Sequence, residues 1–190
     1  MKKNVLLNPF AKIEDKKLLT LGLIAYIIGI FIAFSMKIEL QILRINPLST
    51  IDLPKILLNH SVITICLSLA FFGIGKIINK KTRFIDILNT VFIAFIPYYI
   101  SLFQNINGYL TNETEKVMDA LRQGTILNHT PSFLFIMVTL VGLLFFIHYI
   151  YLLFIGFKTA THSKKIWHYV LFFATLVVID LIVSIIINSI

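Results

Sequence analysis

Two ionisable side chains stand inside long apolar segments, where desolvation makes them costly unless a partner pairs with them. Asp180 lies about fourteen residues into the last apolar segment, and His148 lies about nine residues from the end of the preceding one. Groups of this kind are candidates for proton or ligand handling. The two segments are antiparallel neighbours, yet the two residues are offset by roughly 7 Å along the axis. A direct pair between Asp180 and His148 is therefore strained.

The alternative is that each group is satisfied by an ordinary hydrogen bond. Asp180 has Ser184 and Asn188 one and two turns along the same segment, and a neighbouring segment is a further source of partners. We favour this structural interpretation of Asp180 and His148 over a polar pocket for protons or ligands.

A second polar group lies at the start of the third apolar segment. Asp86 follows Arg83 by three residues, which favours a salt bridge near the membrane surface over a functional role. Asn89 follows on the same segment. Pro97 removes a backbone hydrogen bond and bends a helix unless its neighbours compensate. We interpret that bend as packing geometry rather than as a gate.

No catalytic motif accompanies these residues. The sequence has no metal-ligand motif, phosphate-binding glycine loop or nucleophile elbow, and its five histidines are scattered. A single cysteine, Cys66, excludes a disulfide framework within the chain. We therefore expect no enzymatic activity, no catalytic residues, no metal and no cofactor.

The composition indicates a membrane protein. Of the residues, 58% are hydrophobic and only 14% are charged, which cannot cover the surface of a soluble domain. The formal net charge of +8 suggests nucleic acid as one partner. However, no basic cluster belongs to a recognisable nucleic-acid-binding module. We expect the charge to serve topology and attraction to anionic lipid instead, with no nucleic-acid partner.

Five apolar segments are long enough to cross a bilayer. They cover residues 18–36, 58–78, 84–103, 132–157 and 166–190. The predicted fold is all-α: a polytopic membrane protein with five transmembrane helices in one compact bundle, forming a single domain over residues 1–190. Gly22 and Gly29 in the first segment, with Ala25 and Ala33 near the same stripe, predict a face that packs closely against another span or a second copy.

The connections are predicted to lie at the membrane surface. Asn8 and Pro9 have the order of a helix cap and first turn, which predicts a basic interfacial helix over about residues 8–17. The connection 37–58 is too apolar for a free loop, so we expect it to lie at the interface.

A second interfacial helix is predicted over about residues 113–123. Asn112 and Glu115 have the spacing of a capping box, and Gly124 is a natural stop. Apolar residues between them fall on one helical face.

Lys and Arg are distributed unequally between the two sides of this arrangement. The N-terminal 17 residues hold five, the link 76–83 holds four and the link 158–165 holds three. The connections on the other side, 37–58 and 104–132, hold three and two. Because short loops rich in Lys and Arg stay in the cytoplasm, twelve against five predicts a cytoplasmic N-terminus and a C-terminus outside.

The chain as a whole resembles the Yip family of five-span membrane proteins (Rab/Ypt-interacting proteins and bacterial relatives). The matching elements are Asn8-Pro9-Phe10, Gly73-Ile74-Gly75-Lys76, Phe95-Ile96-Pro97 and the stretch YLLFIGFKTA at 151–160. The resemblance implies a five-span fold with the N-terminus inside. Eukaryotic members carry a long cytosolic region and an Asp-Leu-Tyr-Gly-Pro element linked to GTPase partners, and this sequence shows neither. It resembles the bacterial branch, which implies the bacterial cytoplasmic (inner) membrane.

Two functions are open at this point. The first is a non-enzymatic role in membrane organisation, in which the basic inner face engages anionic lipid headgroups and the bundle binds a membrane-protein partner or a second copy. The second is a small transporter, channel or lipid-moving protein that uses Asp180, His148, Asn89 and Asp86 around Pro97. A water-accessible cavity lined by Asp180 and His148 favours transport, whereas individually satisfied groups favour the first role.

Overall fold

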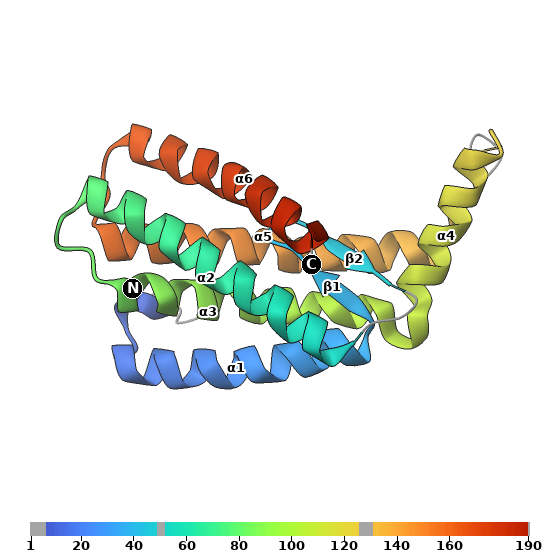
Figure 1. Cartoon of the computed structure of the whole chain (residues 1–190), viewed down its shortest axis with the longest axis horizontal. Coiled ribbons are helices and arrows are strands. Elements are labelled where there is room, and N and C mark those ends of the chain that lie inside the picture. Colours follow the sequence, from blue (N-terminus) through green and yellow to red (C-terminus); the bar gives the residue numbers. More distant parts are fainter. Residues whose placement is uncertain (1–6, 49–51, 126–130, 190) are drawn as a thin grey trace.

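Five long helices run side by side along the molecule in the computed structural model, which describes residues 7–48, 52–125 and 131–189 (Figure 1). They are α1 (Asp15–Ser35), α2 (Leu53–Ile78), α3 (Phe84–Ser101), α5 (Phe133–Thr161) and α6 (Ile166–Ser189). All five stretches are long and apolar enough to cross a membrane. The predicted all-helical fold with five long apolar helices is confirmed.

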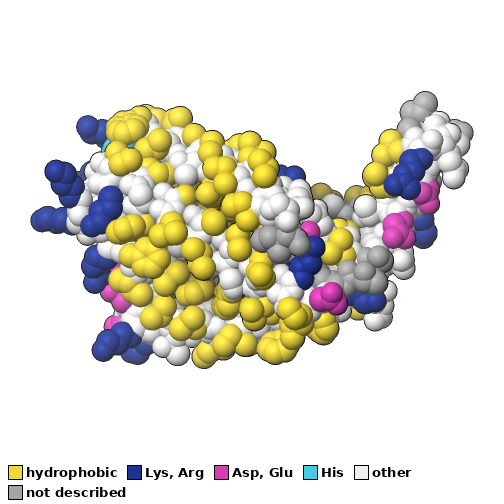
Figure 2. Space-filling view, in the orientation of Figure 1, with side chains coloured by type: hydrophobic (Ala, Val, Ile, Leu, Met, Phe, Trp, Pro, Cys, Tyr) yellow, Lys and Arg dark blue, Asp and Glu magenta, His cyan; other side chains and the backbone are white. Residues whose placement is uncertain are grey.

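The central helix is α3, which packs against α1, α2 and α5, whereas α6 packs mainly against α2. Side chains on all sides of α3 are buried, among them Ile87, Val91 and Phe95. The surrounding helices instead expose rows of large apolar side chains, such as Ile27 and Phe31 of α1 and Leu144 of α5. Such a surface suits hydrocarbon rather than water, and Figure 2 shows these side chains over much of the visible face of the bundle.

The small-residue stripe of α1 packs against α3, as the sequence predicted. A Cβ atom added to Gly22 would lie 2.6 Å from the Cβ of Phe92, and one added to Gly29 would overlap the ring of Tyr99. Both positions therefore require glycine because the α3 side chains occupy the space a larger residue needs.

A short β-hairpin, which the sequence analysis did not predict, fills one end of the bundle. Strand β1 (Ile38–Leu40) pairs antiparallel with β2 (Ile45–Pro47), with Leu40 opposite Ile45. Ile38 and Ile42 are fully buried. The apolar character of this connection is thus explained by packing inside the protein, which corrects the expectation of a loop lying along the interface. In addition, α2 begins at Leu53, earlier than expected.

The N-terminal segment does not form the predicted interfacial helix over 8–17. It contains only a 3₁₀ turn, η1 (Pro9–Ala11), and the residues from Asp15 onward already belong to α1. The side chain of Asn8 makes no capping hydrogen bond. Lys2 and Lys3, which contribute to the predicted charge of this segment, lie outside the described residues, as does Ile190 in the last predicted span.

The helix predicted over residues 113–123 is present but begins earlier than predicted. Helix α4 (Tyr109–Arg122) follows a 3₁₀ segment, η2 (Leu102–Gly108), and angles away from the bundle (Figure 1). Its N-cap is Gly108, whose φ of 73° is left-handed. Asn112 therefore lies inside the helix, and the predicted capping box is wrong.

The predicted stop of α4 at Gly124 is correct. Gly124 has a φ of 69°, and its N–H donates to the carbonyl of Leu121 at 3.2 Å. The N–H of Thr125 donates to the carbonyl of Ala120 at 2.9 Å. This pair of bonds is a Schellman motif, which satisfies carbonyl groups that a helix end would otherwise leave unpaired.

Basic residues gather at the end of the bundle opposite the hairpin, as Figure 2 shows. We call this the basic end, and the opposite one the hairpin end. The basic end holds the start of α1, the α2–α3 link and the α5–α6 link, with Lys12, Lys16, Lys17, Lys76, Lys80, Lys81, Arg83, Lys158, Lys164 and Lys165.

Candidate functional site

The buried carboxylate of Asp180 on α6 is held by the turn of the hairpin. Its Oδ2 accepts a hydrogen bond from Nη2 of Arg44 at 2.8 Å, and its Oδ1 accepts one from the backbone N–H of Leu43 at 3.1 Å. Within the described residues its hydrogen bonds go to the hairpin, not to His148, Ser184 or Asn188. Asp180 therefore takes its partner from a segment 136 residues away.

Tyr98 of α3 holds the same turn from another side. Its hydroxyl lies 3.0 Å from the carbonyl oxygen of Gln41 and 2.7 Å from that of Arg44, and it donates its proton to these two acceptors. The N–H of Gln41 donates to the carbonyl of Arg44 across the turn at 3.0 Å. Tyr98 lies three residues before Ser101, the last residue of α3. The hairpin turn therefore lies about 5 Å from this end of α3, on the side toward the basic end.

Tyr98 and Asp180 together explain how a non-helical turn can stand in an apolar bundle. Backbone N–H and C=O groups at membrane depth must find partners inside the protein, because hydrocarbon offers none. Tyr98 supplies a donor for the carbonyls, and Asp180 supplies an acceptor for the N–H of Leu43. The ring of Tyr149 on α5 stacks on Tyr98 with ring centres 4.8 Å apart, which fixes the position of the hydroxyl.

A second buried polar group lies on α2 at the hairpin end. Nε2 of His60 and the hydroxyl of Tyr99 are 2.5 Å apart, and the ring of Tyr26 stacks on His60 at 4.8 Å. The amide of Asn59 donates to the Glu39 carboxylate of β1 at 2.8 Å. This cluster could not be predicted from the sequence, because its members come from four separate elements.

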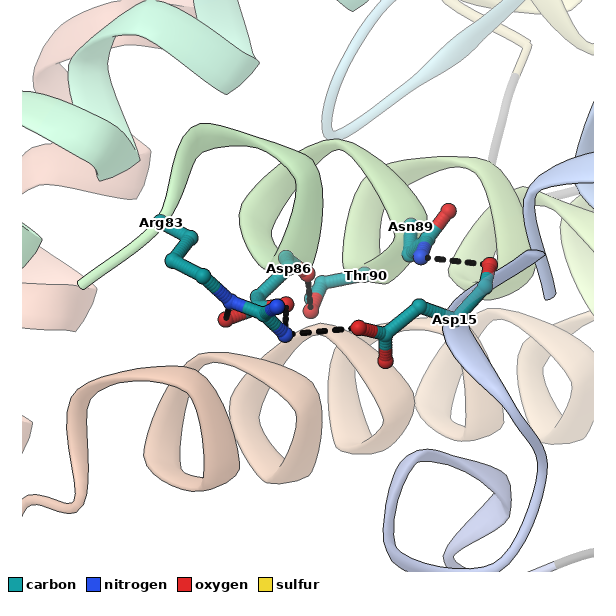
Figure 3. A network of polar contacts seen from close by, with 5 residues as sticks. All are labelled: Asp15, Arg83, Asp86, Asn89 and Thr90. Carbon is teal, nitrogen blue, oxygen red and sulfur yellow. Dashed lines mark hydrogen bonds and ion pairs between the residues drawn. The ribbon is translucent and has the colours of Figure 1, made fainter.

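The predicted salt bridge between Arg83 and Asp86 at the basic end is present, and it includes a third residue, Asp15. Nε and Nη2 of Arg83 donate to the two oxygens of Asp86 at 3.0 and 2.6 Å, and Nη2 also donates to Asp15 of α1 at 2.6 Å (Figure 3). Hydrogen bonds and charge from Asp86 and Asp15 raise the pKa of Arg83 above its already high value. The network is solvent-exposed, so water screens its charges.

Asn89 ties α3 to the first turn of α1. Its buried amide Nδ2 donates to the backbone carbonyl of Asp15 at 3.1 Å, while the hydroxyl of Thr90 donates to the carbonyl of Asp86 at 2.8 Å (Figure 3). The Oδ1 atom of Asn89 is buried without a hydrogen-bond partner in the described part of the chain. Asn89 therefore links α3 to α1 through one hydrogen bond, beside the Arg83–Asp15 ion pair.

The remaining predicted residues stand apart from these networks. Pro97 is buried inside α3, directly before Tyr98. His148 is half-buried on α5, with its ring 6.1 Å from that of Tyr151. The structure thus places Asp180 and Asp86 in two separate networks at opposite ends, and within the described residues no hydrogen bond joins His148 to either.

Comparison with known proteins identifies no family or relative for this chain. No family model, curated protein or solved structure matches this chain. Within residues 7–48, 52–125 and 131–189, no group of three or more His, Cys, Asp or Glu side chains could hold a metal ion.

Proposed function

We propose that this chain is an integral membrane protein with a non-enzymatic role in membrane organisation, and that its basic end lies in the cytoplasm and engages anionic lipid headgroups. The observation that carries the proposal is the gathering of Lys and Arg at one end of a bundle with an apolar surface (Figure 2). The start of α1 and both short links share that end, so the proposed topology has the N-terminus inside and the C-terminus outside.

The electrostatics of the basic end suit an anionic membrane surface. Each Lys or Arg close to such a surface contributes about 1 kcal/mol of attraction, which decays within a Debye length of about 10 Å. The three basic residues of the α5–α6 region, Lys158, Lys164 and Lys165, are exposed there. Resemblance to the bacterial branch of the Yip family supports the same topology and the bacterial cytoplasmic membrane as the location. The proposed role is also compatible with binding to a membrane-protein partner or to a second copy of this chain.

The geometry of Asp180 favours this role over transport. A transport site needs a polar group that can exchange partners with a substrate, an ion or water. Asp180 instead has both oxygens bonded within the protein, and His148 is not joined to it. A carboxylate satisfied within the protein is what we expect of Asp180 in the membrane-organising role.

Cysteine accessibility tests the proposed topology. In a Cys66→Ala background, a single cysteine is introduced either by Lys80→Cys at the basic end or by Arg122→Cys at the end of α4. A membrane-impermeant maleimide added to intact cells should label only the Arg122→Cys variant. The Lys80→Cys variant should react only after the cells are permeabilised. The opposite pattern would exclude the proposed orientation.

Lipid retention tests the proposed headgroup binding. The protein is purified in nanodiscs of mixed zwitterionic and anionic lipid, and the anionic fraction around it is measured. Replacing Lys80, Lys81, Lys164 and Lys165 by Gln should lower that fraction, and 1 M salt should lower it in the unmodified protein. A control variant replaces Lys37, Lys55 and Arg122, at the other end of the bundle, by Gln and should retain the anionic lipid. Equal losses in both variants would contradict the proposal.

A further inference from the structure

Two polar side chains on α5, His148 and Tyr151, belong to neither network described above. Within the described residues neither makes a hydrogen bond, and the one aromatic contact of each is with the other, at 6.1 Å between ring centres. His148 is half-buried, and Tyr151 is 36% exposed. Both side chains therefore have hydrogen-bonding capacity that the rest of this chain does not use.

These two side chains lie deep in the proposed membrane span. His148 and Tyr151 come nine and six residues before Phe157, which is followed by Lys158 at the basic end. At 1.5 Å per residue they lie roughly 14 and 9 Å inside a hydrocarbon core about 30 Å thick. Acyl chains offer no hydrogen-bond partner at that level, and the headgroups lie farther out. A partner for these groups must therefore come from another polypeptide.

Both residues belong to one row along the exposed side of α5. The row repeats at alternating spacings of four and three residues, which keeps one seam of a helix turned toward a neighbouring helix. Its members before His148 are large, apolar and exposed: Met137, Val141 and Leu144. The buried side of α5, with Tyr149 and Leu153, points elsewhere into the bundle. The row is therefore available to a helix from outside.

An apolar groove borders the outer half of this row, where α3 gives way to η2. It has a volume of about 350 Å³, and its walls include Ile100, Phe103, Met137, Val141 and Phe145. Helices associate in lipid largely through close packing of side chains, because the surrounding acyl chains are as apolar as the helices themselves. A groove beside an exposed row gives the side chains of a second helix a place to pack.

A second copy of this chain supplies matching polar groups. A neutral imidazole has one hydrogen-bond donor and one acceptor, and a tyrosine hydroxyl can serve as either. When two identical helices pack in parallel about a two-fold axis, each residue of the seam meets its own counterpart and the residue one turn along. His148 then meets the partner's His148 and the partner's Tyr151, so donors meet acceptors and no charge is buried.

We propose that this chain forms a parallel dimer in the membrane through α5, with His148 and Tyr151 hydrogen-bonded across the two-fold axis and the apolar residues of the row packed beside them. The inference deepens the proposed function by naming a second copy as the partner, and it requires of that function only that α5 spans a bilayer. The glycine stripe of α1, by contrast, is used inside the bundle.

Disulfide crosslinking tests which face of α5 forms the contact. In a Cys66→Ala background, the full-length protein with Leu144→Cys is oxidised by copper phenanthroline in the membranes of the expressing cells, and dimer is measured by non-reducing electrophoresis. Dimer should be the main product, because Leu144 belongs to the row. Leu143→Cys is the matched control: this neighbouring leucine is 50% exposed but turned about 100° away, so it should crosslink at least about tenfold less.

Energy transfer in vesicles tests the role of His148. Copies labelled at Lys80→Cys with donor or acceptor dye, in the Cys66→Ala background, are reconstituted in phosphatidylcholine and diluted with further lipid. Transfer should fall on dilution as dimers dissociate. His148→Leu keeps the apolar packing but loses the hydrogen bonds, so it should raise the dissociation constant about tenfold. His148→Asn keeps a donor and an acceptor and should restore most of the affinity.

Two features of the design keep folding and lipid binding separate from pairing. Excess detergent separates the copies by mass action, and circular dichroism there should be the same for each variant and the unmodified protein. Phosphatidylcholine carries no net charge, so pairing in it does not depend on the basic end. Loss of headgroup binding or an inverted topology would leave the dimer intact, and loss of the dimer would leave both of those measurable.

Three results would overturn the proposal. The first is energy transfer that does not depend on dilution or is absent at every lipid ratio. The second is equal crosslinking of Leu144→Cys and Leu143→Cys, or crosslinking of Leu144→Cys mainly to a different protein. The third is an unchanged dissociation constant in His148→Leu, which would mean that the imidazole needs no partner from a second copy.

Discussion

Each end of the bundle holds an arginine in an ion pair, with two carboxylates at the basic end and one at the hairpin end, yet the surroundings differ. At the basic end, Arg83 bonds Asp86 and Asp15 at 2.6 Å, and these two carboxylate side chains are 22% and 48% exposed. At the hairpin end, Arg44 bonds Asp180 at 2.8 Å, and the Asp180 side chain is only 7% exposed. The bond lengths are nearly equal. Burial, not distance, therefore decides what each pair contributes.

The comparison shows why similar chemistry has different consequences. Water solvates both partners at the basic end whether or not they meet, so removing one leaves no unsolvated charge. Asp180 has no such alternative, because removing its partner leaves a charge inside the protein. The hairpin-end pair is also tied to a backbone N–H, so its loss would disturb the fold of the turn.

The largest effect is expected from Arg44→Gln. Leaving Asp180 buried without its counter-ion should lower the free energy of unfolding by about 3–5 kcal/mol. Asp180→Asn should cost less, because the remaining Arg44 is half-exposed. Reversible unfolding in mixed micelles, followed by circular dichroism, measures both. The double variant Arg44→Gln/Asp180→Asn should recover most of the loss, and a cost for Arg44→Gln no larger than that of Arg83→Gln would refute the comparison.

Tyr98→Phe should have the next largest effect. It removes the donor for the carbonyls of Gln41 and Arg44 while keeping the stacked ring, so the cost should be about 1–3 kcal/mol in the same unfolding measurement. Tyr151→Phe is the matched control, because that ring lies at the surface of α5 and should change little. Equal costs in the two variants would show that the turn does not depend on the hydroxyl.

Asn89→Ala tests the buried link at the basic end. The variant loses one hydrogen bond to the carbonyl of Asp15, so the free energy of unfolding should fall by about 1 kcal/mol. Limited proteolysis should cut the segment before α1 faster than in the unmodified protein. An unchanged cleavage rate would mean that Asn89 does not hold α1 in place.

The smallest effect is expected from Arg83→Gln. Its stability should be close to that of the unmodified protein, and any difference should disappear in 1 M salt. Because Asp86 and Asp15 raise the pKa of Arg83, the guanidinium stays charged throughout the accessible pH range, and its own titration should not alter stability. A loss that persists in high salt would indicate that this network is shielded from water.

Local patterns predicted part of both ends. The Arg83–Asp86 bridge follows from a spacing of three residues on one helix, and the stop at Gly124 follows from its tolerance of positive φ. The third residue of the Arg83 network, Asp15, was not predicted, because it comes from a different helix. The hairpin was missed because strands of three residues give too short an alternation to distinguish from an apolar loop.

The amino-acid sequence by itself determined the five apolar helices and the concentration of positive charge at one end. Both depend on composition and on spacing within single segments, which every stretch of chain carries with it. Only the tertiary structure decided that Asp180 pairs with Arg44 and that Tyr98 satisfies the hairpin turn. Those partners are set by how helices and hairpin pack together, and the free energy of a buried charge depends on whatever that packing brings beside it.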